Sequence, residues 1–144
     1  MKGESPFQLE RLDHLVLRTR DVDRLVSFYC GLGCRRVREI ESLPLVQLAA
    51  GASMIDILGV DGEQGEAGED GRNLDHFALR ISPFDPDAIL AFCAANDIEA
   101  DAPDFLLLGA DGYGPAIYIR DPDGNRLELK GPPEKPRPDS DTGG

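Results

Sequence analysis

One seven-residue sequence occurs twice in this chain and constrains its fold more than any other feature. Leu12–Arg18 reads Leu-Asp-His-Leu-Val-Leu-Arg, and Leu74–Arg80, 62 residues later, reads Leu-Asp-His-Phe-Ala-Leu-Arg. Five of the seven positions are identical, and the other two are apolar in both copies. A repeat at this separation indicates two equivalent modules. His14 and His76, the only histidines of the chain, hold the same position in the two copies.

The chain is long enough for one domain built from both modules. At 144 residues it can bury a substantial core, whereas a module of about 60 residues would be marginally stable alone. We therefore expect the modules to pack into a single domain. The expected boundaries are 10–58 for module one, 59–73 for a Gly/Glu-rich linker, 74–130 for module two, and 1–9 and 131–144 for disordered ends.

The composition argues against several classes of partner. The formal net charge of −12 argues against nucleic acid or an anionic membrane surface. No run approaches the roughly 20 apolar residues of a membrane span, and Met1–Glu10 lacks the apolar segment of a signal peptide. Three cysteines fit reduced thiols in a cytoplasmic protein. Cys30 and Cys34 could form half of a zinc site, but no second pair exists, so two core thiols are favoured.

Each module is expected to run strand, helix, strand, strand, strand, an order that places the chain in the α+β class. Asp21 is expected to cap the first helix, which Gly31 and Gly33 end. Asp85 or Asp87 is expected to cap the second helix. From alternation and turn residues, the expected strands are 11–18, 35–41, 45–50 and 53–58, then 74–81, 98–108, 116–120 and 126–130, the last two joined by a turn at 121–125.

Further motifs accompany the repeated strand. Module one continues with Asp21-Val22 and Ser27-Phe28-Tyr29, and Ile117–Leu129 contains Asp-Pro-Asp-Gly-Asn followed by Glu-Leu. With these motifs, residues 12–130 resemble the vicinal oxygen chelate superfamily, which includes glyoxalase I, extradiol dioxygenases, methylmalonyl-CoA epimerase, fosfomycin-modifying enzymes and bleomycin resistance proteins. Within it, the chain looks most similar to small glyoxalase-like proteins labelled virulence-associated.

The resemblance implies a fold and a ligand set. Two tandem βαβββ modules would form a cup-shaped mixed sheet with the helices outside, and many such proteins are homodimers. His14, His76 and Glu128 match the metal-ligand positions, and Asp56 holds the place in module one that corresponds to Glu128. Asp is shorter than the Glu or Gln often found there, so whether Asp56 reaches the metal, acts through water or only pairs with a neighbour stays open. A three-ligand His/His/Glu site is therefore expected.

The residue pattern agrees with this ligand set. Glu128 alternates with Leu127 and Leu129 and so points away from the helix-packed face, and Asp56 interrupts an otherwise apolar strand. A carboxylate on a core strand is costly unless it is paired or coordinated. Two imidazoles with one or two carboxylates suit Zn, Ni, Fe, Mn or Co and leave positions open for a substrate.

The leading hypothesis is a divalent-metal-dependent enzyme of the glyoxalase-like type, acting on a small oxygen-chelating substrate. Isomerase, lyase or epimerase chemistry would run through an enediolate, with Glu128 or Asp56 moving the proton.

Three alternatives remain. An Fe(II) extradiol-type dioxygenase is possible, although its usual additional acid–base histidine is missing. A thiol transferase acting on an antibiotic would need cationic pocket residues that are not evident. A non-enzymatic protein that sequesters an antibiotic would rely on an aromatic groove, and the chain has only three Tyr, six Phe and no Trp.

Four more residues are candidates for lining the substrate pocket: Gln47, Tyr113, Tyr118 and Arg120. Tyr118 and Arg120 share a strand face by alternation. The glycine-containing run 109–114 lacks the Lys and the following helix of a phosphate-binding loop. We therefore expect this run to form a flexible lid over the cup.

Overall fold

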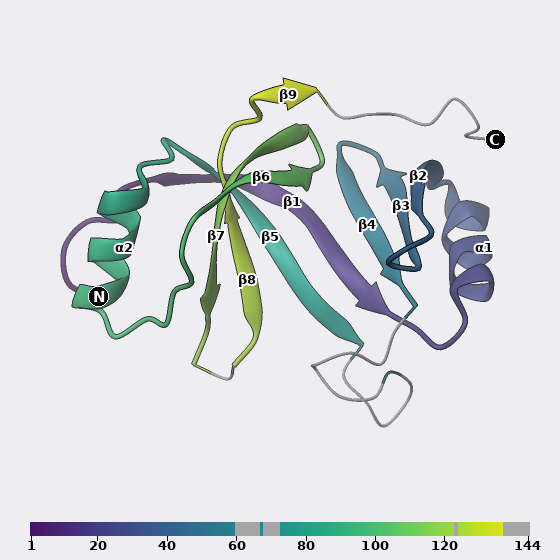
Figure 1. Ribbon diagram of the computed structural model, residues 1–144, viewed down its shortest axis with the longest axis horizontal. Helices are drawn as coiled ribbons and strands as arrows, with labels where there is room; N and C mark the ends of the chain where they lie inside the picture. The colour runs from purple at the N-terminus through teal and green to yellow at the C-terminus, as the bar shows by residue number, and fades with distance from the viewer. Residues whose placement is uncertain (60–66, 68–72, 123, 137–144) are drawn as a thin grey trace. The chain divides into compact units, whose positions relative to one another are not determined.

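The computed structural model describes residues 1–59, 67, 73–122 and 124–136. The α+β class and the βαβββ order of both modules are confirmed (Figure 1). The elements are β1 (Gln8–Arg18), α1 (Val22–Leu32), β2 (Arg35–Ile40), β3 (Leu45–Ala50), β4 (Ser53–Leu58), β5 (Leu74–Ser82), α2 (Pro86–Ala95), β6 (Asp104–Gly109), β7 (Gly112–Arg120), β8 (Arg126–Lys130) and β9 (Lys135–Pro136). Neither helix of this described part has the length and apolar character needed to cross a membrane.

The described chain forms two compact units. The first unit lies within residues 14–75, and the second joins residues 1–13 to residues 76–136. The long strand β1 therefore begins in the second unit and continues, from His14 onward, in the first.

The first unit contains strands in the order β2-β3-β4-β1, with β1 and β4 parallel and the other pairs antiparallel. Helix α1 begins where the Asp21 carboxylate accepts a hydrogen bond from the Arg24 backbone N–H at 3.1 Å. The helix buries an apolar core against β3 and β4 that includes Val26, Val46, Leu48 and Ile57. Since strand residues alternate, Gln47 of β3 and Asp56 of β4 face away from α1.

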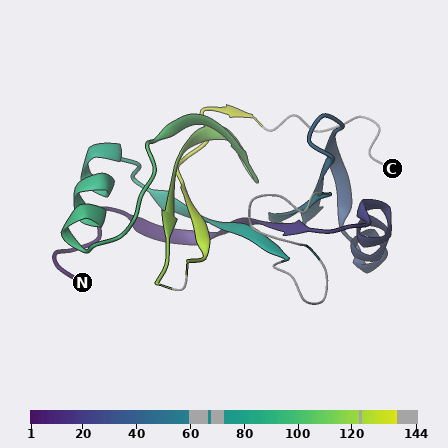
Figure 2. The ribbon, with the colours of Figure 1, turned by 60° about the horizontal axis from the view of Figure 1, so that its bottom comes forward.

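The second unit contains strands in the order β5-β8-β7-β6, with β5 and β8 parallel and the others antiparallel. Asp85, rather than Asp87, caps α2 by accepting from the Ala88 N–H at 3.2 Å. Helix α2 lies to one side of β7 and β8 (Figure 2). Its core with the strands contains Ile81, Ile89, Cys93, Ile117 and Leu129.

The expectation of a flexible lid over residues 109–114 is wrong. Strand β6 runs to Gly109 and β7 starts at Gly112, and these two residues pair directly across a tight hairpin. Gly112 has a φ of 138°, a conformation that glycine adopts without a steric penalty. The glycines thus allow a two-residue turn. Strand β7 starts at Gly112, earlier than the expected start at residue 116.

Both ends of the described chain are held by hydrogen bonds. The backbone N–H of Lys2 donates to the Asn96 side chain at 2.6 Å, and β1 already begins at Gln8. The Glu134 N–H donates to the Tyr113 carbonyl at 2.7 Å, just before β9 pairs with β7. Most of the expected linker and residues 137–144 lie outside the described residues.

Candidate metal centre

The polar side chains of the second unit gather on the face opposite α2. Leu129 of β8 belongs to the core under α2, so Glu128, its neighbour along the strand, points the other way. In the sheet register, Glu128 lies across from Tyr118 of β7 and Ala78 of β5. His76 precedes Ala78 by two residues and therefore shares this face.

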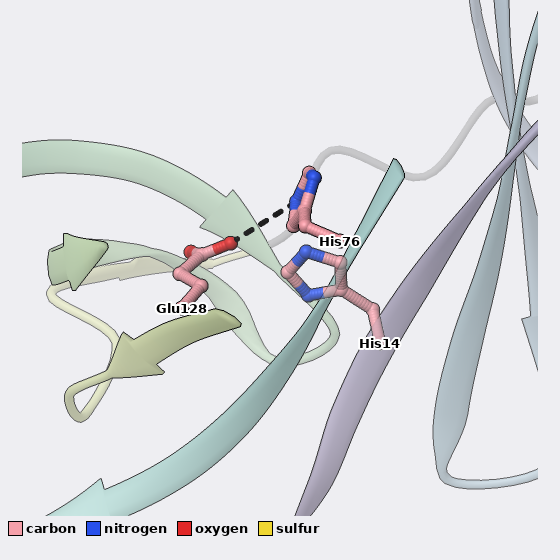
Figure 3. A group of neighbouring side chains, drawn as sticks. All are labelled: His14, His76 and Glu128. Carbon is pink, nitrogen blue, oxygen red and sulfur yellow. Dashed lines mark ion pairs between the residues drawn. The ribbon is translucent and has the colours of Figure 1, made fainter. Parts of the chain in front are cut away.

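His76 and Glu128 are close neighbours on this face. The Nε2 atom of His76 lies 3.5 Å from a carboxylate oxygen of Glu128, and the side chains are 11% and 2% exposed (Figure 3). A carboxylate removed from water to this degree needs a cationic or hydrogen-bonding partner. The pair therefore offers one nitrogen and one oxygen ligand atom in a nearly dry environment.

His14 joins this pair from strand β1. It follows Asp13, the last residue that β1 contributes to the second unit, so the peptide bond to Asp13 ties its position to that unit. One ligand atom from each of His14, His76 and Glu128 lies within 4.8 Å of the others. The three side chains point toward one another (Figure 3). No other group of His, Cys, Asp and Glu in the described residues meets this criterion.

An aromatic and cationic stack borders the pair. The rings of Tyr118 and His76 meet edge to face, with centroids 5.4 Å apart and an interplanar angle of 83°. The guanidinium carbon of Arg126 lies 3.9 Å from the centroid of the Tyr118 ring. Tyr118 thus contacts one ligand candidate and one cation at the same time.

Lys130 is a buried cation two residues beyond Glu128. Its Nζ donates to the carbonyls of Leu107 at 2.5 Å and Gly114 at 2.8 Å, and the residue is 2% exposed. Burial lowers the pKa of the Lys130 ammonium, and the nearby carboxylates of Glu128 and Asp13 offset this only in part. Lys130 therefore ties β8 to the β6–β7 hairpin.

Comparison with known proteins places the chain in a family. The model of the Glyoxalase/Bleomycin resistance protein/Dioxygenase superfamily matches residues 11–129. The chain belongs to this superfamily. Its other name is the vicinal oxygen chelate superfamily, so the resemblance seen in the sequence is confirmed. No curated protein matches the chain.

Solved structures of vicinal oxygen chelate proteins share the fold at low identity. Methylmalonyl-CoA epimerase from Mycobacterium tuberculosis is 20% identical, with a TM-score of 0.63 over 91% of this chain and 93% of its own. An extradiol ring-cleaving dioxygenase from B. fuscum is also 20% identical, with a TM-score of 0.67 over 90% of this chain and 35% of its own. These likenesses show the fold and leave the reaction open.

Asp56 and Gln47 lie together in the first unit. The Gln47 amide donates to the Asp56 carboxylate at 3.2 Å across the β3–β4 register, and the residues are 3% and 6% exposed. The metal-capable group described above does not include Asp56. Of the roles considered for Asp56, pairing with a neighbour is the one for which a contact is seen.

The other pocket candidates lie on β7. Tyr118 borders His76, whereas Tyr113 stands near the hairpin turn, paired in register with Leu108. The Arg120 guanidinium reaches Asp101 at 3.7 Å. Sequence reasoning missed Arg126, although its separation of two residues from Glu128 already placed both side chains on one strand face.

Proposed function

We propose that His14, His76 and Glu128 bind one divalent metal, chosen from Zn, Ni, Fe, Mn or Co. The observation that carries this proposal is the convergence of three ligand atoms within 4.8 Å. Ligands placed 2.0–2.2 Å from an ion are roughly 3–3.5 Å apart, so small side-chain shifts would suffice to close the site. Two nitrogens and one oxygen are a donor set that these metals accept, with positions left for a substrate.

We further propose a glyoxalase-like enzyme that acts on a small substrate with two vicinal oxygens, by isomerase, lyase or epimerase chemistry. When bound, the metal would polarise a substrate carbonyl as a Lewis acid. The chain's own carboxylates would move the proton: Glu128 or Asp56 takes it from the carbon beside the carbonyl, leaving an enediolate, and returns it to carbon. The burial of both carboxylates supports this assignment, because a buried site keeps bulk water away from the reacting carbon.

Several finer features belong to the same proposal. Gln47, Tyr113, Tyr118 and Arg120 would line the substrate pocket. The chain would act as a homodimer in the cytoplasm, where the free thiols of its three cysteines stay reduced. A related fold occurs in a structure of methylmalonyl-CoA epimerase in complex with methylmalonyl-CoA, so acyl-CoA esters belong among the substrates to be tested.

An Fe(II) extradiol-type dioxygenase is the second candidate. Two histidines and one carboxylate form the ligand set of non-haem Fe(II) oxygenases, which favours it. The chain has no third histidine to serve as an acid or base. A protein that sequesters an antibiotic would bind its small molecule equally well without metal.

Elemental analysis of the purified protein tests the metal site. The wild type and Glu134→Gln, a control at an exposed carboxylate of the same unit, should carry about one metal per chain. His14→Ala, His76→Ala and Glu128→Gln should lose it, with unchanged circular dichroism. Full metal content in His14→Ala would overturn the ligand assignment.

A substrate screen then separates the candidate functions. The metal-loaded protein is offered 2-oxoaldehydes with and without a thiol, acyl-CoA esters, catechols and bleomycin. Turnover of an oxoaldehyde or epimerisation of an acyl-CoA supports the proposal. Oxygen uptake with catechols favours the dioxygenase, and metal-independent binding of bleomycin favours sequestration.

A further inference from the structure

Two arginines face each other beside the candidate metal centre. Arg120 of β7 and Arg126 of β8 are direct partners in the antiparallel register. Both lie two residues from the Tyr118–Glu128 pair, so all four side chains share the face opposite α2. Like charges directly across a strand pair are destabilising. A bound anion would remove the repulsion between the two guanidinium groups.

Among the described residues, few carboxylates directly contact this pair. Arg120 has Asp101 at 3.7 Å, a carboxylate whose side chain is 45% exposed, and exposed ion pairs of this kind contribute little. Within the described residues, the Arg126 side chain makes no ion pair or hydrogen bond, and its Nε is buried without an acceptor. The guanidinium carbon of Arg126 lies 3.9 Å from the centroid of the Tyr118 ring. A cation–π contact orients the guanidinium but leaves its N–H donors unused.

The arginine pair lies close to the candidate ligands. Phe77 and Leu127 are register partners in the parallel β5–β8 pair, so their preceding residues, His76 and Arg126, are neighbours on the polar face. Arg126 and Glu128 are separated by two strand residues, or roughly 6.6 Å. The Tyr118 ring contacts both His76 and Arg126. An anion held by the arginines would therefore lie close enough to the proposed metal for one small molecule to contact both.

We propose that Arg126 and Arg120 form an oxyanion seat, and that the substrate of the proposed enzyme carries a carboxylate or phosphate group in addition to its two chelating oxygens. This inference rests on the proposed function for the identity of the ligand. The planar guanidinium of Arg126, held against Tyr118, would present two N–H donors to two oxygens of the anion, and Arg120 would add a second positive charge.

The first test uses the metal-free protein and inorganic phosphate. In the presence of EDTA, phosphate should raise the melting temperature of the wild type by about 3 °C relative to chloride at equal ionic strength. Arg126→Gln should lose this increment, and Arg126→Lys should keep part of it. Arg24→Gln, which removes an exposed arginine of the first unit, should respond as the wild type does. Equal increments in all four proteins would overturn the seat.

The second test asks whether the seat acts together with the metal. Zinc-loaded protein is titrated calorimetrically with three hydroxamates that share the same chelating group. Acetohydroxamate carries no further anionic group, succinic monohydroxamate carries a carboxylate, and phosphonoacetohydroxamate carries a phosphonate. Arg126→Gln should weaken binding of the two anionic probes by about 10–100-fold and that of acetohydroxamate by less than about twofold. The tighter anionic probe identifies the preferred anion. A uniform loss over all three probes would contradict the inference.

The two tests separate this inference from the proposed function. If His14→Ala keeps its metal while phosphate still stabilises the wild type and not Arg126→Gln, the ligand assignment fails and the oxyanion seat stands. If the metal depends on His14 but no anionic probe distinguishes Arg126→Gln from the wild type, the seat fails and the metal site stands.

Discussion

Tyr118 lies directly across the β7–β8 register from Glu128, and its ring meets that of His76 edge to face. The tyrosine is therefore in a position to hold the imidazole in the orientation that its pairing with Glu128 requires. Side chains that orient metal ligands commonly matter for affinity nearly as much as the ligands themselves.

Tyr118→Ala should therefore weaken zinc binding by about 10-fold or more, whereas Tyr118→Phe, which keeps the ring, should stay within about threefold of the wild type. Competition with a chromophoric chelator measures both affinities. Tyr29→Ala in the first unit serves as the control for loss of an aromatic side chain. Equal affinities for Tyr118→Ala and the wild type would show that His76 is oriented by other contacts.

Lys130→Met should destabilise the fold by about 2–4 kcal/mol, because the carbonyls of Leu107 and Gly114 lose a charged donor. Urea unfolding followed by circular dichroism measures the change. Lys135→Met, at an exposed position of β9, should have almost no effect. If Lys130→Met lowered the free energy of unfolding as little as the control does, the two hydrogen bonds would contribute little to stability.

The lowered pKa of Lys130 also predicts a pH dependence. The unfolded chain keeps this proton up to about pH 10.5, whereas the folded protein releases it at a lower pH. Between these values the unfolded state binds more protons, so this group makes the wild type more stable as pH rises. The stability difference between wild type and Lys130→Met should widen from pH 7 to pH 10. A constant difference would contradict the lowered pKa.

Gly109→Ala should cost about 1–3 kcal/mol, because a Cβ at this position has no room. It would lie 2.7 Å from the Asp13 carboxylate oxygen and 2.7 Å from the Lys130 Cε atom. Gly31→Ala in α1, where a Cβ meets no atom within 4 Å, should instead stabilise the protein by about 0.5–1 kcal/mol. Urea midpoints of the two variants should thus move in opposite directions, and a shift in the same direction would contradict the packing described for Gly109.

Cys93 should be the last of the three thiols to react with iodoacetamide in the native protein at pH 8. Its residue is 2% exposed, and burial raises the pKa of the thiol, so little reactive thiolate is available. Peptide mass spectrometry follows each site, and in denaturant the three rates should become similar. Alkylation of native Cys93 as fast as that of Cys30 would indicate frequent opening of the core under α2.

The repeat and the alternation of apolar residues predicted the module order, and Asp residues before the helices predicted the two helix caps. The family resemblance indicated His14, His76 and Glu128 as ligand candidates. These features depend on local chemistry, since a strand that buries every second residue already determines which face its polar residues occupy. The lid over residues 109–114 was mispredicted because glycine occurs both in loops and in tight hairpins. Only the pairing of Gly109 with Gly112 separates the two possibilities.

By itself, the sequence determined that two modules exist and that each carries a histidine at the same strand position. Tertiary structure decided which side chains meet: His76 with Glu128, Tyr118 with Arg126, and Arg126 opposite Arg120. The physical reason is that register between strands is set by long-range hydrogen bonding and core packing. A shift of β7 against β8 by one residue would leave every local pattern intact and separate Arg126 from both Tyr118 and Arg120.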